Sequence, residues 1–124
     1  MKKQILYYSF AIAFIVCVFA SANRVSAQTE PMTGGYGDTS VTDKDVKSAA
    51  NFAVKTRAAQ KHNGLKLVMI QKAEVQVVAG LNYRICMVVR EGKGPTRTVT
   101  AVVYKDLKNH KSLSRWKNGG CSNL

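Results

Sequence analysis

The clearest pattern of hydrophobic and polar positions lies in residues 65–90, where two apolar runs flank a short break. Every second position of the second run is apolar: Leu81, Tyr83, Ile85, Met87 and Val89. A period of two is typical of a β-strand with one buried face. Gly80 lies between the runs and can adopt the positive φ that a tight reversal needs. The pattern therefore predicts a β-hairpin built from strands 65–75 and 81–89.

The tip of this hairpin, Gln76–Gly80, is unusual because Val77, Val78 and Ala79 are apolar. Hairpin tips normally carry polar residues that favour turns. An apolar tip either packs on another part of the fold or marks a contact with a partner.

Residues 42–63 carry the pattern of an amphipathic helix. Thr42, with Asp45 three positions later, fits a capping box that uses Asp in place of Glu, and Asn63-Gly64 is a stop signal. Small apolar residues recur at helical spacing: Val46, Ala49, Ala50, Ala53 and Val54. This stripe predicts a helix that approaches a sheet face closely.

Two further strands are expected at Thr96–Lys105 and Lys111–Lys117, with the mostly polar segment Asp106–His110 as the tip between them. Residues 28–40 are polar and rich in glycine, which indicates a flexible N-terminal trunk. One helix followed by four strands in a meander is an α+β fold, with the helix layered on an antiparallel sheet.

Residues 1–27 have the features of a signal peptide: a basic start, an apolar run, and the small residues Val25-Ser26-Ala27 at the end. A membrane anchor is the competing interpretation, because the apolar run is about long enough to span a bilayer. The small residues and the polar sequence after them favour cleavage. We therefore expect a secreted domain of residues 28–124 with one core and no membrane attachment after cleavage.

The formal net charge of the chain is +12, and the predicted leader contributes Lys2, Lys3 and Arg24 to it. Such a balance attracts anionic surfaces, whether nucleic acid, membrane or acidic protein. Lys and Arg are scattered and form no run, however. A basic solvated face is the simpler interpretation, and no nucleic-acid partner is expected.

No constellation of catalytic or metal-binding residues stands out. His62 and His110 lie far apart and have no metal-site spacing with Cys86 or Cys121. The chain shows no evident set of Ser, His and Asp for catalysis and no phosphate-binding glycine loop. From these residues we expect no catalytic site, no bound cofactor and no metal site.

Cys86 and Cys121 are the cysteines of the exported domain, where a disulfide is permitted. Cys86 shares the strand parity of Asn82 and Arg84, so it should face away from the helix. One strand separates it from the last strand, a distance of about 10 Å that is too long for a direct bridge. The loop 118–120 can carry Cys121 back across the outer face. An intramolecular disulfide is favoured, and two free thiols or a cross-chain bond are the alternatives.

The segment Gln76–Gly80 carries the pattern Gln-x-Val-x-Gly, which resembles the central inhibitory hairpin of the cystatins, protein inhibitors of papain-like cysteine proteases. The order of trunk, helix and strands is similar to the cystatin fold over about the whole of residues 28–124. The resemblance implies one long helix packed on a four- to five-stranded antiparallel sheet. It also implies a wedge of three segments: an N-terminal glycine, this hairpin and a second hairpin.

The protease-binding residues that the resemblance implies are Gly34 or Gly35, then Gln76, Val77, Val78, Ala79 and Gly80, then Asp106 and Leu107. The second hairpin of many cystatins carries Pro-Trp, and Asp106-Leu107 in that place is a departure. Trp116, the only Trp, lies in the final strand and is not assigned to the wedge. The missing aromatic anchor should weaken binding, because an interfacial Trp often contributes about 2 kcal/mol or more.

The resemblance implies a secreted, reversible inhibitor of papain-like cysteine proteases and not an enzyme. The alternative is a non-inhibitory cystatin-like basic module that binds anionic surfaces, either membrane or polyanion. Asn63 lies in the helix-to-strand loop, where some cystatins carry an Asn that inhibits legumain-type proteases, although Asn-Gly is also an ordinary helix stop. A monomer and a strand-swapped dimer both stay open.

Overall fold

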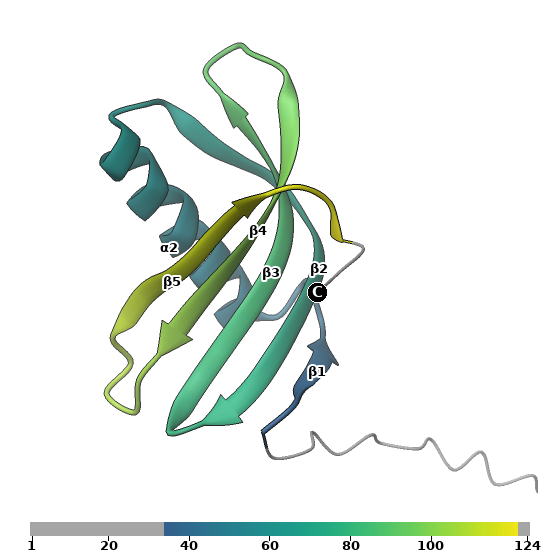
Figure 1. Ribbon diagram of the computed structural model, residues 1–124, viewed down its shortest axis with the longest axis vertical. Helices are drawn as coiled ribbons and strands as arrows, with labels where there is room; N and C mark the ends of the chain where they lie inside the picture. The colour runs from purple at the N-terminus through teal and green to yellow at the C-terminus, as the bar shows by residue number, and fades with distance from the viewer. Residues whose placement is uncertain (1–33, 122–124) are drawn as a thin grey trace, which may run out of the picture.

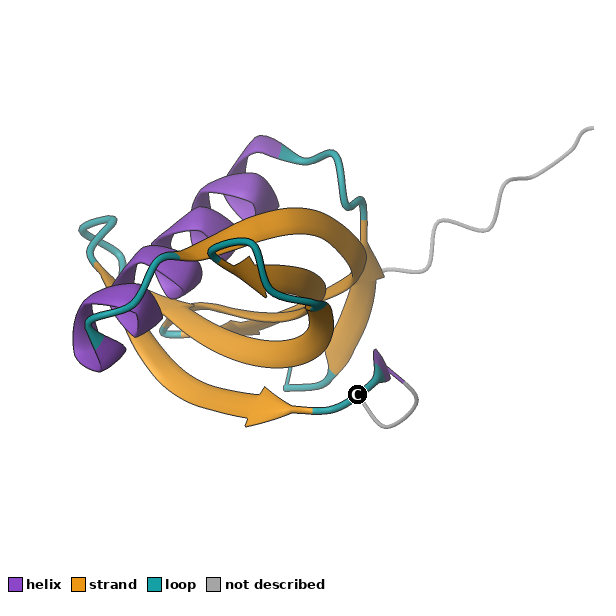
Figure 2. Cartoon of the chain, turned by 90° about the horizontal axis from the view of Figure 1, so that it is seen from above, coloured by secondary structure: helices purple, strands orange, loops and turns teal. Residues whose placement is uncertain are grey.

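The computed structural model describes residues 34–121, so the predicted leader lies outside the described residues. The elements are β1 (Tyr36–Thr39), α2 (Lys44–Lys61), β2 (Leu65–Val78), β3 (Gly80–Glu91), β4 (Thr96–Lys105) and β5 (Lys111–Asn118). The strands form one antiparallel sheet in the order β1-β2-β3-β4-β5, which curls around the helix (Figures 1 and 2). The predicted α+β architecture is confirmed, with five strands. Over residues 34–121 no helix is long and apolar enough to cross a membrane.

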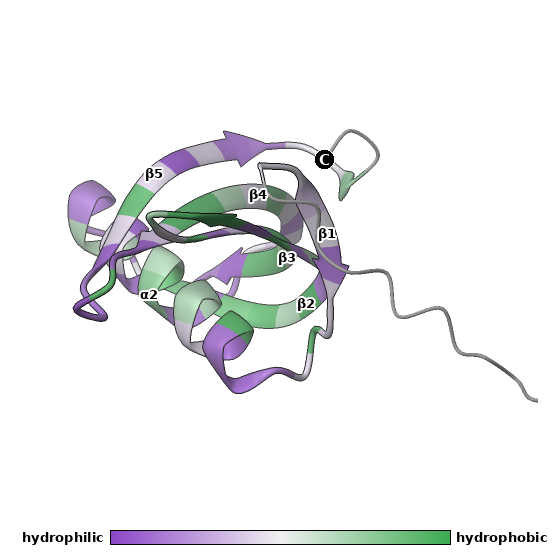
Figure 3. Cartoon of the chain, turned by 90° about the horizontal axis from the view of Figure 1, so that it is seen from below, coloured by the Kyte–Doolittle hydropathy of each residue, from purple (hydrophilic) through white to green (hydrophobic). Residues whose placement is uncertain are grey.

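The core lies between α2 and the inner face of the sheet. The stripe of small residues on α2 is buried, and its alanines let the helix approach the strands closely. The sheet contributes side chains with no exposed surface: Ile85, Met87, Val89, Val99, Ala101 and Val103. Figure 3 shows that β5, which lies at the sheet edge, is mostly hydrophilic with one strongly hydrophobic position. The period of two therefore identified the buried face of the sheet correctly.

Both ends of α2 differ slightly from the prediction. The N-cap is Asp43 and not Thr42, because Asp43 Oδ1 accepts hydrogen bonds from the backbone amides of Asp45 at 2.7 Å and Val46 at 3.2 Å. A carboxylate there also interacts favourably with the positive end of the helix dipole. At the other end, His62 adopts the left-handed conformation at φ 51°, one residue before Asn63-Gly64.

Part of the predicted flexible trunk is a strand. Residues 36–39 pair with Ala73–Gln76 of β2, and the Arg84 guanidinium lies 4.0 Å from the centre of the Tyr36 ring. The polar, glycine-rich composition gave no sign of this strand, because its ladder uses backbone groups at a sheet edge. The first hairpin is also tighter than predicted: pairing continues to Val78 and resumes at Gly80, so Ala79 alone makes the reversal.

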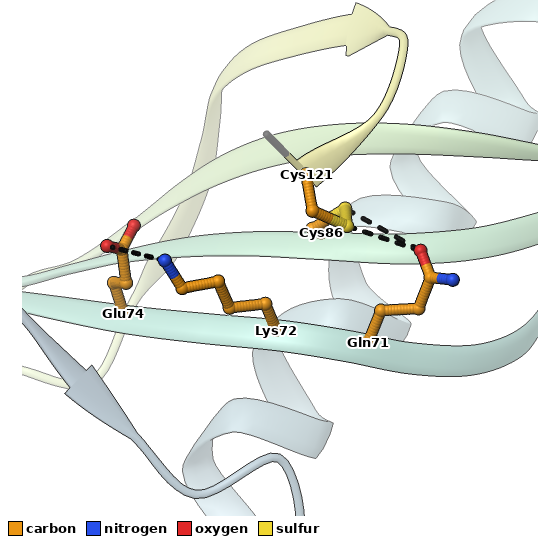
Figure 4. The surroundings of a disulfide bond; sticks show 5 residues. All are labelled: Gln71, Lys72, Glu74, Cys86 and Cys121. Atoms are coloured by element: carbon orange, nitrogen blue, oxygen red, sulfur yellow. Dashed lines mark hydrogen bonds and ion pairs between the residues drawn. A yellow bond between two sulfur atoms is a disulfide. The ribbon is translucent and has the colours of Figure 1, made fainter. Parts of the chain in front are cut away.

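A disulfide joins Cys86 of β3 to Cys121, with their Cα atoms 5.5 Å apart (Figure 4). This is the intramolecular pairing that the sequence favoured. The returning loop is held to β4, since the backbone amide of Gly119 donates to the carbonyl of Thr98 at 3.0 Å. Cys86 lies on the predicted outer face but is wholly buried. The side-chain oxygen of Gln71 lies 3.2 Å from Cys121 Sγ, so Gln71 packs beside the disulfide (Figure 4).

Glu74 is a buried carboxylate on the outer face of β2. Arg84 Nε donates to Glu74 Oε2 at 2.7 Å, and Lys72 Nζ lies 3.4 Å from Glu74 Oε1 (Figure 4 shows the lysine contact). Burial by itself would raise the pKa of Glu74, but the hydrogen bond and charge of Arg84, with help from Lys72, outweigh burial and lower the pKa. The carboxylate is therefore ionised in the folded protein.

We expect this ion pair to make stability depend on pH. The pKa of Glu74 lies below its ordinary value of 4.5 in the folded state, so its contribution is complete above that value and is lost as the pH falls through the folded pKa. Glu74→Gln should therefore flatten the acid limb of the stability profile, measured by urea unfolding from about pH 7 to about pH 3. The control Glu91→Gln removes an exposed carboxylate 3.6 Å from Arg97 and should keep the wild-type profile. An acid limb that is the same in both variants would contradict this account.

Candidate functional site

Three segments that are distant in the sequence meet at one end of the sheet. They are Gly34-Gly35 before β1, the β2–β3 reversal and the β4–β5 loop, which all lie at the lower end in Figure 1. Two side-chain contacts join them: Gln76 Nε2 donates to the carbonyl of Gly34 at 2.9 Å, and the Tyr104 hydroxyl donates to the carbonyl of Ala79. The residues assigned from the resemblance therefore form one continuous edge, which we call the wedge.

The first hairpin presents apolar side chains to solvent. Val77 is 40% exposed and Val78 is 41% exposed, and Ala79 is exposed as well. Strand pairing up to Val78 and the Tyr104 hydroxyl bond to Ala79 fix the backbone of this tip. The apolar tip is therefore preformed and does not pack back on its own fold.

Gly80 has a different role from the rest of the tip, because it is buried. Its φ is +119°, a value that residues with a side chain rarely adopt. A Cβ at this position would overlap the carbonyl oxygen of Lys105 and would lie 2.9 Å from the Tyr104 ring. Gly80 is thus needed for the close approach of β3 to β4.

We expect Gly80→Ala to destabilise the fold by about 2–4 kcal/mol, from backbone strain together with steric overlap. Gly119→Ala is the matched control, because Gly119 has a similar φ of +131° but has open space around its Cβ. The control should be destabilised by backbone strain alone, which lowers its free energy of unfolding by about 1–2 kcal/mol. Urea unfolding of both variants gives the comparison, and equal losses would show that the overlap contributes nothing.

Gln76 connects the trunk to the hairpin, and Asn82 supports it. Asn82 Nδ2 donates to Gln76 Oε1 at 3.0 Å, while Gln76 uses its own amide to hold Gly34. Asn82 lies directly opposite Gln76 in the β2–β3 ladder. This chain of hydrogen bonds places the start of β1 beside the apolar tip. The sequence did not predict that Asn82 and Tyr104 support the wedge. Their strand parity placed them on the outer face of the sheet and indicated nothing more.

In the β4–β5 loop, Asp106 fixes the backbone conformation and the next residue, Leu107, is exposed to solvent. Asp106 Oδ1 accepts hydrogen bonds from the backbone amides of Lys108 and His110, each at 2.8 Å, and Asp106 Oδ2 lies 3.1 Å from His110 Nδ1. Burial would raise the pKa of Asp106, but these contacts outweigh it and lower the pKa. Leu107 is 82% exposed. Of the two assigned residues, Leu107 is thus the more exposed, and Asp106 shapes the loop.

The wedge is tied to the helix at its base. Lys105, the last residue of β4, lies with its Nζ 2.9 Å from Asp45 Oδ2 in the first turn of α2. The Tyr83 hydroxyl lies 3.5 Å from the same oxygen. Burial raises the pKa of Tyr83 to about 12, with a further contribution from the charge of Asp45. Tyr83 therefore stays protonated and serves as a donor. These contacts limit movement of the hairpins relative to the core.

Two other residues singled out from the sequence lie away from the wedge. Asn63 is at the opposite end, where the neighbouring Gly64 carbonyl accepts from the amide of Gly92 at 3.3 Å. The Asn63 side chain is half-buried, and its Oδ1 is enclosed without a hydrogen-bond partner among residues 34–121. Trp116 packs against the core, with the Arg57 guanidinium 5.8 Å from its ring centre. In the described part of the chain, no three His, Cys, Asp or Glu side chains gather as metal ligands.

Residues 39–118 match the family model described as aspartic acid proteinase inhibitor. Cysteine proteinase inhibitor 8 of Oryza sativa subsp. japonica is 32% identical over 89 residues, which cover 70% of this chain and 72% of that protein. A cystatin of Cryptophis nigrescens is 40% identical over 78 residues. That alignment covers 61% of this chain and 55% of the snake protein, so the chain spans about half the length of this relative.

The salivary cystatin of the soft tick Ornithodoros moubata has the same fold. Its crystal structure superposes with a TM-score of 0.62 at 21% identity and covers 71% of this chain and 99% of the tick chain. At this identity the likeness concerns the fold alone. Together with the family model and the rice relative, it shows that the chain belongs to the cystatin family.

Proposed function

We propose that the protein is a secreted, reversible inhibitor of papain-like cysteine proteases that blocks the active-site cleft with the wedge. The observation that carries the proposal is the preformed edge of exposed apolar side chains, Val77, Val78 and Leu107, at one end of the sheet. Single exposed hydrophobic residues are common on protein surfaces, but three gathered on two adjoining hairpin tips indicate a contact surface.

The rigidity of the wedge supports tight binding. The Tyr104–Ala79 and Gln76–Gly34 hydrogen bonds hold the tips in place, and the Lys105–Asp45 pair holds their base. Little freedom remains to be lost on association, so more of the contact energy appears as affinity. The exposed side chains of the two tips, Val77, Val78 and Leu107, are apolar and carry no reactive group. Inhibition therefore occurs by occlusion, and the inhibitor should leave the complex uncleaved.

The β4–β5 loop is expected to lower the affinity for a proteinase. Leu107 presents a smaller surface than an aromatic residue would, and the neighbouring Lys108 and His110 are polar. Between the two tips lies a shallow hollow of about 330 Å³, lined by Ala79, Tyr104, Asp106, Leu107, Lys108 and His110. A proteinase side chain that enters this hollow would partly replace the contact that a Trp provides.

The test is a papain inhibition assay with the purified, disulfide-bonded protein. Micromolar inhibitor should abolish hydrolysis of a small fluorogenic substrate, activity should return on dilution, and mass spectrometry should find the inhibitor intact. If a correctly folded sample leaves papain unchanged at that concentration, the proposal fails. The basic module that binds anionic surfaces would then be the function to test.

Inhibition of aspartic proteinases is a second candidate, because the matching family model carries that description. The same apolar edge can occlude a different cleft, and the absence of an aromatic side chain from the second loop fits a different partner. Pepsin, assayed at a pH at which circular dichroism shows the inhibitor folded, separates the two candidates. Inhibition of pepsin without inhibition of papain would replace the first proposal with this one.

A further inference from the structure

A polar pocket of about 420 Å³ lies on the outer face of the sheet, away from the helix. It is lined by side chains from four strands: Tyr36, Asn82, Arg84, Val102, Ser114 and Arg115. Two of the six side chains are guanidinium groups, and no carboxylate is among them. The pocket is separate from the exposed apolar tips of the wedge, which contribute no residue to it.

Arg84 is held in a fixed position at this pocket. Its Nε donates to the buried carboxylate of Glu74 at 2.7 Å, and its guanidinium stacks on the Tyr36 ring at 4.0 Å. Its terminal amino groups have no hydrogen-bond partner within residues 34–121. Glu74 is already occupied by Arg84 and Lys72, so its charge is compensated. The Arg84 side chain is therefore already ordered in the folded protein, so little further conformational entropy is lost when its free amino groups bind a ligand.

Arg115 and Ser114 supply the opposite side of the pocket. A register shift between Val102 and Val103 leaves an extra residue in β5, which places Ser114 beside Arg115 opposite Val102. Arg115 is exposed and forms no ion pair with another residue of the described part of the chain. Two guanidinium groups and a hydroxyl thus border one hollow, and the terminal amino groups of Arg84 and the side chain of Arg115 face no carboxylate partner in residues 34–121.

We propose that this pocket is an oxoanion site that binds a carboxylate or sulfate group between Arg84 and Arg115. Planar guanidinium groups match the geometry of such anions, and charge-assisted hydrogen bonds are the strong ones. Asn82 and Ser114 add neutral donors that complete the ligation. Without the three basic residues of the predicted leader, the formal net charge falls from +12 to +9, and this charge raises the local concentration of anions around the chain.

Two sources can provide this anion: a free anion in solution, or an acidic side chain of a bound proteinase. The place of the pocket favours the second source. Asn82 pairs directly with Gln76 of the wedge, so one lining residue of the pocket lies on the same rung of the ladder as a wedge residue. In this proposal, the rim of the cleft of a proteinase seated on the wedge reaches the pocket. This part of the inference rests on the proposed function.

The first arm of the test uses the inhibitor alone. The purified, ¹⁵N-labelled, disulfide-bonded protein is titrated with sodium sulfate and, at matched ionic strength, with sodium chloride. Sulfate should give saturable amide shifts confined to Asn82, Arg84, Ser114 and Arg115. Arg115→Gln should weaken sulfate binding about fivefold or more. The control Lys117→Gln removes the same charge from the same strand outside the pocket and should change it less than about twofold.

The second arm measures association with the proteinase that the protein inhibits. Arg115→Gln should slow the association rate about threefold, with Lys117→Gln close to wild type, and sulfate should slow the wild type more than chloride does. Sulfate shifts that do not saturate, or that spread over all basic residues, would overturn the pocket. Saturable shifts with unchanged association rates would keep the pocket and overturn the proteinase as its source. The first arm needs no proteinase, so its failure is distinguishable from failure of the proposed inhibition.

Discussion

Val78→Asp is expected to weaken inhibition of papain about 100-fold or more while the protein stays folded. Val78 is 41% exposed at the tip of the first hairpin, so a carboxylate there remains hydrated in the free inhibitor. In the complex the same carboxylate would be buried in the cleft, at a cost of about 3 kcal/mol or more without a partner. The inhibition constant measures the effect, and the urea midpoint shows that folding is unchanged.

Val68→Asp provides a matched control for this result. Val68 is 48% exposed, also lies in β2, and sits in the half of the strand far from the wedge. The same change in shape and charge is thus made at similar exposure on the same strand. The control should inhibit like the wild type. Equal inhibition by the wild type and Val78→Asp, or equal losses in both variants, would show that the first hairpin does not enter the cleft.

Removal of the disulfide should cause the largest loss of stability. Cys86 and Cys121 are separated by 35 positions, and closing a loop of this length stabilises the fold by about 4 kcal/mol in the chain-entropy model. Cys121→Ser should therefore lower the free energy of unfolding by about this amount. Urea unfolding of the oxidised wild type and the variant measures the difference.

Reduced wild type serves as the control for the serine substitution. Once the bridge is reduced, the wild type and Cys121→Ser should unfold at the same urea concentration, because both chains then lack the same crosslink. A variant as stable as the oxidised wild type would show that the crosslink does not constrain the unfolded chain. Alkylation followed by intact mass should find no free thiol in the wild-type domain of residues 28–124.

The parts of the fold that could be predicted are those with a local pattern. Alternation identified the bounds of β4, Thr96–Lys105, and the buried face of β3, because burial on one side imposes a period of two. The apolar content of the first hairpin tip left two alternatives, packing on the fold or contact with a partner, and the exposure of Val77 and Val78 excludes the first. The small residues of α2 likewise predicted a close helix–sheet contact.

The rest depended on partners that are distant in the sequence. β1 has no apolar alternation, and its pairing depends on the neighbouring edge of β2. Gln76 donates a hydrogen bond to Gly34, 42 positions away in the sequence, and no local pattern can show such a contact. Gly80 was correctly placed at the reversal, but its burial follows from the approach of Lys105 and Tyr104 in β4. The sequence therefore indicated which segments form the wedge, and the tertiary contacts determine which of their atoms a partner can reach.

The division of roles in the second loop has a consequence for how this inhibitor can evolve. The side chain of Asp106 sets the loop backbone, while Leu107 makes little contact with the rest of the fold at 82% exposure. Replacing Leu107 therefore changes what a proteinase meets at almost no cost to folding, since surface substitutions usually alter stability by about 0.5 kcal/mol or less. Natural selection or a combinatorial library can explore all side chains at this one codon. Preference among targets can thus diverge between gene copies while the scaffold stays the same.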